Sequence, residues 1–500
     1  MHSARHSAAR TIRHRTGVTT AARPTAAATV AVQPWQPLLT GGLRDRALRA
    51  VDALGQALAA DCGQQAGPTA AALAPGLLAS GPLASGPLAS GAAGLAVCLA
   101  VTASTRGDER AAGLAWACLA AARQAQARHV MPAALYSGFP GVAWAADFVG
   151  GLLPGRPTDD PNAAIDSAGI DSAGIDNAAI DAVLASTLRR YPDSGPYGLA
   201  DGLTGLGAYA LARWPRPAAA DCLAAVIERL AGRARRDGNG VYWWTPPSAT
   251  AAGQARRHPG GGVDLTAAHG MAGPIALLGR AHALGVEPRT VRPLLDGAVR
   301  WLLAHQAGTG ADLTVPGFVA DAAGPAAANA GGNGGTSQTG GGYGGASQAA
   351  SRLAWCDGDP GVALALLLAA RDVGEPAWAL AATRLALAAA ARSPGPGCTL
   401  SADRADQADQ AGICHGAAGL AHVFGRLYQL TGAQALAEAA ITWAERTVAL
   451  CEAGWAAAAG VGLLDGAAGV VLVLLACCQQ TEPDWDQPLF ISTGRSGAGR

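Results

Sequence analysis

Two cysteines and one histidine stand at corresponding places in two short, glycine-rich segments of the chain. The segment "WCDGDPG" contains Cys356, and "CHGAAG" contains the adjacent residues Cys414 and His415. Two thiolates and one imidazole form a soft donor set that suits zinc. Three protein ligands leave the fourth tetrahedral position open, as in catalytic rather than structural zinc sites. The segments therefore predict one Zn²⁺ ion with room for a further ligand.

The charge of this donor set restricts the chemistry that the metal can support. Two thiolates already cancel the charge of a zinc ion, so the metal would be a weak Lewis acid toward water. A third thiolate, supplied by a substrate, would stay deprotonated near neutral pH and would remain electron-rich. The site therefore favours activation of an incoming thiol over hydrolysis. His269, whose imidazole titrates near neutrality, is the candidate to deliver or accept the proton.

An internal repeat indicates which elements position these residues. One polar residue, Gly-x-x-Gly and an apolar run occur together seven times. The first glycines of the seven units are at positions 91, 138, 202, 270, 358, 416 and 466. Without two low-complexity inserts the period is about 50 residues, which is enough for two helices and two connections. Each apolar run would form a helix buried on all sides, whereas the runs between them are amphipathic.

This alternation of apolar and amphipathic helices indicates an all-α fold in two layers. We expect one domain over residues 41–482, an α/α toroid (double-layer barrel) of seven inner and seven outer helices. An open solenoid would have more polar terminal repeats. Closure would bring the residue before each first glycine to one rim, where His269, Asp357 and His415 would be neighbours. These polar residues can also cap the free N–H groups at the starts of the inner helices.

The other segments are expected to lie outside this ring. Residues 1–40 are interpreted as a disordered N-terminal tail, because the first 33 carry five Arg, three His and no acidic residue. Low-complexity inserts near 155–182 and at 324–351 are expected to be loops or disordered segments, because they hold too little apolar area to order themselves. Residues 483–500 are interpreted as a flexible C-terminal tail.

The composition excludes several classes of function. The 36 basic residues balance the 36 acidic ones, so no nucleic-acid partner is expected. The sequence contains no lysine, which excludes Schiff-base chemistry and a Walker-type phosphate loop. Ten cysteines in 500 residues are too few for a disulfide scaffold. The most apolar run, residues 469–478, is too short to span a bilayer, and we expect a soluble cytoplasmic protein.

Three motifs together carry a family resemblance. In chain order they are "AAHGMAG", "WCDGDPG" and "CHGAAG". They resemble the A-H-G-x-x-G, W-C-x-G-x-P-G and C-H-G motifs of the lanthionine synthetase C (LanC-like) cyclases, and the resemblance covers roughly residues 45–480. It implies an α/α toroid with zinc at its centre. It also implies addition of peptide cysteine thiols to dehydroalanine or dehydrobutyrine, which forms lanthionine or methyllanthionine rings.

The same resemblance implies roles for individual residues. Cys356, Cys414 and His415 match the zinc ligands of the family. His269 matches the acid that protonates the enolate after a Michael-type addition. Arg352 matches an arginine four residues before the first cysteine ligand, and it could steady developing enolate charge. The alternative for Arg352 is a structural role at a helix end.

The chain departs from the family pattern at two places. The family usually shows Tyr-Asp before the third Gly-x-x-Gly, and here Tyr197 matches but Gly198 stands where the Asp belongs. Asp201, three residues further on, either substitutes for that Asp beside His269 or merely caps a helix. Asp357 replaces a tyrosine that usually follows the first cysteine ligand. The first departure puts the proton-transfer step in doubt and leaves the metal ligands untouched.

The resemblance also implies partners. The expected substrate is a dehydrated precursor peptide made by a separate dehydratase, and a peptide transporter would complete a membrane-associated assembly. Two alternatives from other classes remain open. One is the family branch that adds glutathione to dehydroamino acids in damaged proteins, and the other is a non-catalytic scaffold that binds the modified peptide.

Overall fold

The structure is a computed structural model. It describes residues 35–64, 86–153, 177–249, 256, 258–320, 351–393, 410–455 and 460–492. All of these residues belong to one compact unit, which spans residues 34–500. The predicted insert at 324–351 and most of the one near 155–182 lie outside the described residues, as does most of the predicted N-terminal tail.

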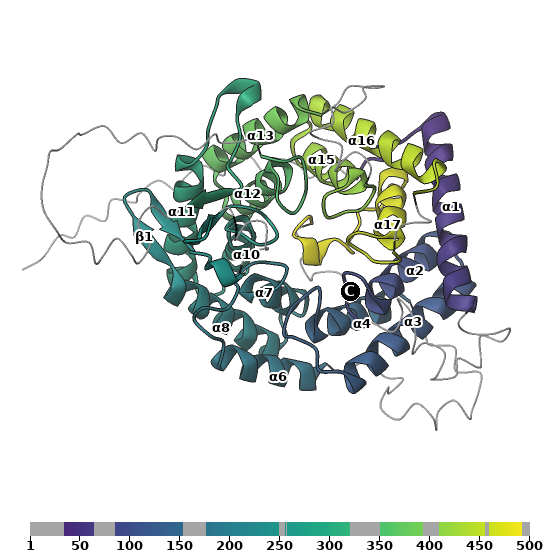
Figure 1. Cartoon of the computed structure of the whole chain (residues 1–500), viewed down its shortest axis with the longest axis horizontal. Coiled ribbons are helices and arrows are strands. Elements are labelled where there is room, and N and C mark those ends of the chain that lie inside the picture. Colours follow the sequence, from purple (N-terminus) through teal and green to yellow (C-terminus); the bar gives the residue numbers. More distant parts are fainter. Residues whose placement is uncertain are drawn as a thin grey trace, which may run out of the picture. The chain divides into compact units, whose positions relative to one another are not determined.

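Seven of the described helices form an inner ring (Figure 1). They are α2 (Ala92–Arg106), α4 (Phe139–Leu152), α7 (Leu203–Ala212), α10 (Ala272–Ala283), α12 (Asp359–Val373), α15 (Ala417–Thr431) and α17 (Ala467–Cys478). Each packs against the next in this order, and α17 packs against α2. The ring is therefore closed. Its helices are buried along almost their whole length, which explains their apolar composition.

Seven further described helices form the outer layer. They are α1 (Gly41–Gln64), α3 (Glu109–Arg128), α6 (Ala178–Arg189), α8 (Pro217–Arg233), α11 (Pro288–Ala304), α13 (Pro376–Ala391) and α16 (Gln434–Glu452). The first of them, α1, packs against the last inner helix α17 and against the outer helices α16 and α3, so it closes the outer layer. The predicted α/α toroid with seven inner and seven outer helices is confirmed. No described helix is both long and apolar enough to cross a membrane.

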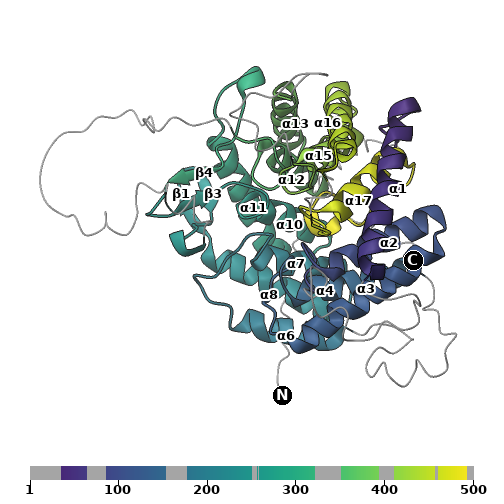
Figure 2. The same cartoon turned by 45° about the vertical axis from the view of Figure 1, so that its right-hand side comes forward.

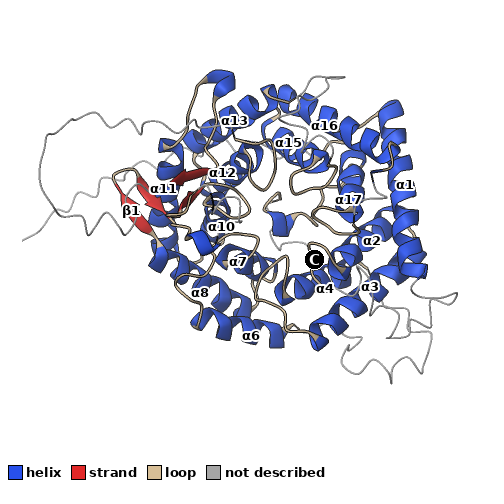
Figure 3. Ribbon diagram, in the orientation of Figure 1, coloured by secondary structure: helices blue, strands red, loops and turns tan. Residues whose placement is uncertain are grey.

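Two short antiparallel strand pairs were not predicted from the sequence. Strands β1 (Arg235–Asp237) and β2 (Gly240–Tyr242) form one hairpin, and β3 (Gly262–Asp264) pairs with the distant β4 (Phe318–Ala320). Figure 3 shows them in red on one side of the ring. They lie in or beside the connections on either side of α10 and α11, so they border the segment that leads to His269. The remaining short elements are the 3₁₀ helices at Pro247–Ala249, Gly310–Asp312 and Gln487–Leu489.

The capping role expected for the rim residues is wrong. In six of the seven inner helices the first glycine itself is the N-cap, and no side chain caps the helix. At Gly358, for example, a side chain would overlap the backbone of Arg352 and Ala354. Because the glycine takes the cap position, the polar residue before it stays outside the helix.

The second glycine of the repeat lies where the backbone leaves no room for a side chain. A Cβ atom on Gly141 would overlap the carbonyl oxygen of Leu135, six residues earlier, and the second glycines of five other units meet the corresponding oxygen in the same way. The chain enters each inner helix so tightly that only hydrogen fits at this position. This tight entry holds the rim segment against the helix that follows it.

Replacement of Gly141 by alanine should therefore lower the free energy of unfolding by about 1–3 kcal/mol, because the backbone must move to admit the methyl group. The matched control is Gly113→Ala in α3, where a methyl group meets nothing within 4 Å. That change should raise the free energy of unfolding by about 0.4–1 kcal/mol. Urea denaturation followed by circular dichroism measures both. Equal stability of the two variants would contradict the tight entry.

A hoop of backbone hydrogen bonds joins the repeats at the rim. In six of the seven repeats, the residue two positions before the first glycine donates its N–H to the carbonyl oxygen of its counterpart in a neighbouring repeat. The N···O pairs are Ala89–Tyr136 at 3.0 Å, Leu464–Ala89 at 3.1 Å, Cys414–Leu464 at 3.0 Å, Cys356–Cys414 at 3.2 Å, Ala268–Cys356 at 3.0 Å and Ala200–Ala268 at 2.9 Å. Six of the seven junctions are bridged in this way. The hoop fixes the register in which the repeats present their side chains.

The predicted C-terminal tail, 483–500, is wrong for residues 483–492. Trp485, Asp486, Leu489 and Ile491 are almost fully buried. We call residues 483–492 the central plug, because Figures 1 and 2 show this yellow segment in the middle of the ring. Tryptophan, leucine and isoleucine at irregular spacing produce no helical or strand period. Their burial therefore depends on a ring that other parts of the chain build.

Hydrogen bonds and ion pairs hold the central plug to the inner helices. Trp355 Nε1 donates to the carbonyl oxygen of Leu489 at 3.2 Å, which ties the plug to the segment that carries Cys356. Asp486 accepts from His422 Nε2 at 2.8 Å and from Arg426 Nη2 at 3.0 Å, both on α15. The pKa of Asp486 is lowered, because the charge of Arg426 and the hydrogen bond with His422 outweigh the effect of burial.

Two other predicted boundaries are also wrong. Trp35 is buried and donates to the carbonyl oxygen of Ala476 at 3.2 Å, so the packed chain begins within the predicted 1–40 tail. The end of the predicted 155–182 insert forms the start of α6. There Asp181 is buried, and its carboxylate is stabilised because it accepts from Arg213 Nε and from Tyr209 Oη, each at 2.9 Å. These paired polar groups could not be recognised from the low-complexity sequence alone.

Candidate metal centre

The hoop of hydrogen bonds brings the two rim cysteines together. Cys356 precedes α12 and Cys414 precedes α15, and these two inner helices pack against each other. The backbone N–H of Cys356 donates to the carbonyl oxygen of Cys414. His415 follows directly in the chain. Residues that are about 60 positions apart thus share one junction of the ring.

The three side chains have the spacing of a metal site. One ligand atom from each of Cys356, Cys414 and His415 lies within 4.8 Å of the others, and Cys356 Sγ is 3.7 Å from His415 Nδ1. Tetrahedral zinc with bonds of about 2.3 Å to sulfur and 2.0–2.1 Å to nitrogen separates S and N by about 3.6 Å. The donor types and this distance both fit zinc.

The three donors differ in their exposure to solvent. Cys356 is buried, Cys414 is partly buried and His415 is exposed. A metal held by the three would therefore be covered on the Cys356 side and open toward the mouth of the ring. Without a cation, hydrogen bonding to Cys414 and burial raise the pKa of Cys356, and the nearby Cys356 sulfur raises the pKa of His415. The raised pKa values mean that these side chains hold protons when no metal is bound, and a divalent cation would displace those protons on binding.

Asp357 and Arg352 form an exposed pair beside this site. Arg352 Nη1 lies 3.5 Å from Asp357 Oδ2, and Cys356 Sγ lies 3.5 Å from Asp357 Oδ1. The carboxylate thus stands between the guanidinium and the thiol. Arg352 lies in the segment before α12, where its backbone pairs with that of Gly358. Its guanidinium is turned toward Asp357, the residue that departs from the family pattern.

His269 and Asp201 meet on the neighbouring part of the rim. His269 Nδ1 is 3.9 Å from Asp201 Oδ1, and their side chains are 57% and 47% exposed. The nearby carboxylate of Asp201 is the main reason that the pKa of His269 is raised, with help from the charges of Asp264 and Asp357 and against the effect of burial. Of the two sequence interpretations of Asp201, contact with His269 fits the structure, because Gly202 is the N-cap of α7.

Gly198 explains why the partner of His269 lies elsewhere. A Cβ atom at position 198 would overlap the backbone of His269 and Ala268. No side chain fits there in this arrangement, because the backbone occupies the space. Asp201 instead reaches His269 from the rim position of its own repeat.

Tyr197 faces away from His269. Its side chain is buried, and its hydroxyl donates to the carbonyl oxygen of Trp243 at 3.2 Å and accepts from Thr245 Oγ1 at 3.2 Å. Burial raises the pKa of Tyr197 far above its ordinary range, so it remains a neutral phenol. Its observed contacts are with the segment that follows β2 rather than with the rim.

One residue near the site was missed in the sequence. Asp264, at the end of β3, accepts from the backbone N–H of Thr266 at 2.8 Å and lies close enough to His269 to raise its pKa. Burial raises the pKa of Asp264 itself. Its spacing of five residues from His269 was the available signal, but only the turn after β3 brings the two together.

Comparisons with known proteins give a family for this arrangement. Residues 83–490 match the family model described as lanthionine synthetase C-like protein, which covers most of the chain. The chain belongs to the lanthionine synthetase C-like family. It is therefore a lanthionine synthetase C-like enzyme, as the three motifs indicated. No curated protein sequence matches it.

Solved structures show the same fold for this lanthionine synthetase C-like chain. A structure of nisin cyclase matches it with a TM-score of 0.61 and 17% sequence identity. The match covers 82% of this chain and 93% of the nisin cyclase chain. At this identity the match shows a shared toroid, which agrees with the closed ring of seven inner and seven outer helices.

Proposed function

We propose that this lanthionine synthetase C-like protein is a zinc-dependent lanthipeptide cyclase. It would add cysteine thiols of a dehydrated peptide to dehydroalanine or dehydrobutyrine in the same peptide, and form lanthionine or methyllanthionine rings. One observation carries the proposal. A Cys-Cys-His set with zinc spacing and a histidine with a raised pKa lie on the same hydrogen-bonded hoop.

In this reaction the metal site and the rim histidine have separate roles. Cys356, Cys414 and His415 would hold zinc, which when bound lowers the pKa of a substrate thiol and keeps it as a thiolate. The sulfur forms a bond to the β-carbon of the dehydroamino acid, and the π electrons move onto the α-carbon and its carbonyl as an enolate. His269 then donates a proton to the α-carbon. The substrate thiol has lost one proton, so the overall addition is balanced.

Asp201 and Arg352 support this proton transfer in different ways. The carboxylate of Asp201 favours the protonated form of His269 and faces Nδ1, which leaves Nε2 directed to donate. Arg352, released from Asp357 by a carbonyl oxygen of the substrate, would stabilise enolate charge. Asp201 is thus a positioning residue for His269, not a group that contacts the reacting atoms.

Replacement of Asp201 by asparagine should shift the pH profile of cyclisation. Because the carboxylate raises the pKa of His269, its loss lowers that pKa, and the histidine loses its proton at a lower pH. The alkaline limb of the rate profile should therefore move to lower pH, with a loss of about threefold to tenfold at neutral pH, below the usual full contribution of a general acid. Rates from pH 5 to 9 measure this. A uniform loss at every pH would indicate only a structural role.

Mass spectrometry with thiol alkylation tests the proposed activity. The purified protein with zinc is incubated with a synthetic peptide that contains one dehydroalanine and one cysteine. Cyclisation leaves the mass unchanged and removes the thiol that the alkylating reagent would label. Adding glutathione tests the first alternative, because a glutathione adduct without a ring would identify the glutathione-adding activity. Bound peptide with its thiol still free would identify the non-catalytic scaffold.

The proposed reaction also determines which enzyme must act on the peptide before this one. It consumes dehydroamino acids, so a separate dehydratase must act before it on the precursor peptide. We place the reaction in the cytoplasm, with a peptide transporter as a further partner at the membrane. Co-purification of the tagged protein with these two classes of enzyme tests the assembly, and recovery of the protein alone would argue against it.

A further inference from the structure

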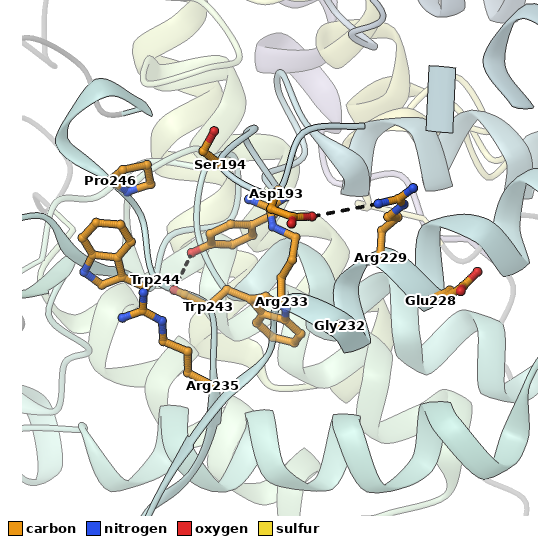
Figure 4. A pocket seen from close by; sticks show the side chains of 11 residues that line it. Asp193, Ser194, Glu228, Arg229, Gly232, Arg233, Arg235, Trp243, Trp244 and Pro246 are labelled. Atoms are coloured by element: carbon orange, nitrogen blue, oxygen red, sulfur yellow. Dashed lines mark hydrogen bonds and ion pairs between the residues drawn. The ribbon is translucent and has the colours of Figure 1, made fainter. Parts of the chain in front are cut away.

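A cavity of about 650 Å³ lies beside the rim on the side of the ring that carries His269. Its walls come from the connection between α6 and α7, the C-terminal end of α8, and the segment that follows β2 (Figure 4). The first of these segments continues to Asp201 and the last continues to His269. Tyr197 lines the cavity and its hydroxyl bonds join two of the walls. We call this cavity the arginine–tryptophan pocket.

Arg233 brings an incompletely paired cation to the pocket. Its side chain is half-buried, and burial lowers its pKa. Nη2 donates to the carbonyl oxygen of Gly195, whereas Nη1 is buried and has no acceptor among the described residues. No described carboxylate lies within ion-pair distance of Arg233. A guanidinium that is partly removed from water without a counter-ion favours an anionic ligand.

Trp244 provides a second unused donor in the same pocket. Its indole Nε1 is buried and has no acceptor among the described residues. The guanidinium of Arg235 lies over its ring, 4.7 Å from the centroid, so the ring is held in place beside a further positive charge. Buried N–H donors without acceptors are uncommon in folded proteins, where buried polar groups are usually bonded.

The other charges of the pocket leave it weakly positive. Arg229 is 3.9 Å from Asp193, whose side chain is 93% exposed and therefore a weak counter-charge. Glu228 is exposed as well. The partly exposed ring of Trp244 adds apolar area next to the cations. The pocket thus offers a positive group, directional donors and aromatic surface in one place.

We infer that the arginine–tryptophan pocket binds an acidic side chain of the peptide substrate, together with an adjacent apolar residue. The carboxylate would accept from the guanidinium of Arg233, and the apolar side chain would contact the ring of Trp244. The inference rests on the proposed function, since it assigns an anchor for that peptide substrate. A peptide held here lies next to the segments that carry Asp201 and His269, so its reactive residues can extend over the rim.

Fluorescence anisotropy with three labelled peptides tests the carboxylate. The probes are a peptide with one Glu beside a Phe and an amidated C-terminus, its Gln twin, and the Gln twin with a free C-terminal carboxylate. The full chain with zinc should bind the Glu peptide at least tenfold more tightly than the amidated Gln twin. Tighter binding of the third probe than of the Glu peptide would overturn the side-chain assignment in favour of a terminal carboxylate. Equal binding of all three would overturn the inference.

Variants locate the binding. Arg233→Gln should reduce the affinity for the Glu peptide toward that of its Gln twin, and Trp244→Ala should weaken the binding of both peptides because it removes the aromatic surface. The matched control is Arg236→Gln, an exposed arginine of β1 that does not line the pocket, and it should leave the affinity unchanged. Circular dichroism and zinc content check that each variant is folded. A folded Arg233→Gln protein with undiminished preference for Glu would refute the pocket.

The outcome can be separated from that of the proposed function. Cyclisation of the short dehydrated peptide does not require an acidic residue, so it reports on the proposed reaction and not on the pocket. If cyclisation occurs and the Glu preference is absent, only the pocket inference fails. If the Glu preference depends on Arg233 but no ring forms, the pocket stands and the proposed reaction fails. A phosphoserine twin that binds more tightly than the Glu peptide would reassign the pocket to phosphorylated peptides.

Discussion

Replacement of Cys356 by alanine should abolish zinc binding and ring formation together. The side chain of Cys356 is the most buried of the three donors. The backbone N–H of Cys356 donates to the carbonyl oxygen of Cys414, and this bond sets the geometry of the pair. Loss of an outer partner of a metal ligand typically costs 10–100-fold, so loss of the ligand itself should reduce cyclisation by at least about 100-fold. Elemental analysis gives the zinc content, and thiol alkylation with mass spectrometry gives the remaining activity.

A matched cysteine separates this effect from a general loss of thiols. Cys451 lies on the outer helix α16, away from the rim, and burial raises its pKa to about 11. Cys451→Ala should therefore retain one zinc per chain and the full rate. If Cys356→Ala also retained its zinc, the metal would have to be held by other residues, and the proposed centre would be refuted.

Replacement of His269 by asparagine should stop proton transfer without loss of the metal. His269 is not among the three donors, and its raised pKa comes mainly from Asp201. A general acid typically contributes 10²–10⁴-fold, so we expect the cyclisation rate to fall by about this factor while the zinc content stays unchanged. The rate with the short dehydrated peptide and the zinc content of the same sample measure the two quantities.

The appropriate control is another exposed histidine. His129 follows α3 and lies outside the rim, so His129→Asn should leave the rate unchanged. A deuterium label gives a second readout, because the proton at the α-carbon comes from the acid and should enter from one face only. Undiminished cyclisation by His269→Asn would mean that solvent protonates the enolate and that His269 has no part in the step.

The repeat explains why the metal ligands could be predicted from the sequence. Cys356 and Cys414 stand at the same position of their units, and a ring of equivalent units must place equivalent positions side by side. The hoop of hydrogen bonds is the physical form of that equivalence. Apolar inner helices and amphipathic outer helices likewise follow from burial on all sides or on one side. The closed toroid was therefore predictable from local patterns.

Features that depend on contacts between unlike segments were not predictable in this way. The central plug has no period of its own, and Trp485 is buried only because the ring surrounds it. The hydroxyl bonds of Tyr197 and the unused donors of Arg233 and Trp244 arise where the α6–α7 connection meets the segment after β2. The meeting of Asp201 with His269 was one of two open interpretations, because spacing alone does not distinguish a helix cap from a partner.

The central plug lies in the middle of the toroid and is surrounded by the inner helices. Trp355 and Tyr136 hold the plug from the rim side, through bonds to the carbonyl oxygens of Leu489 and Pro488. Under the proposed function, a peptide would arrive and depart over the rim, because the central plug lies in the middle of the ring that the described residues form. Under the same proposal, rings already closed in the peptide would not have to pass through the toroid.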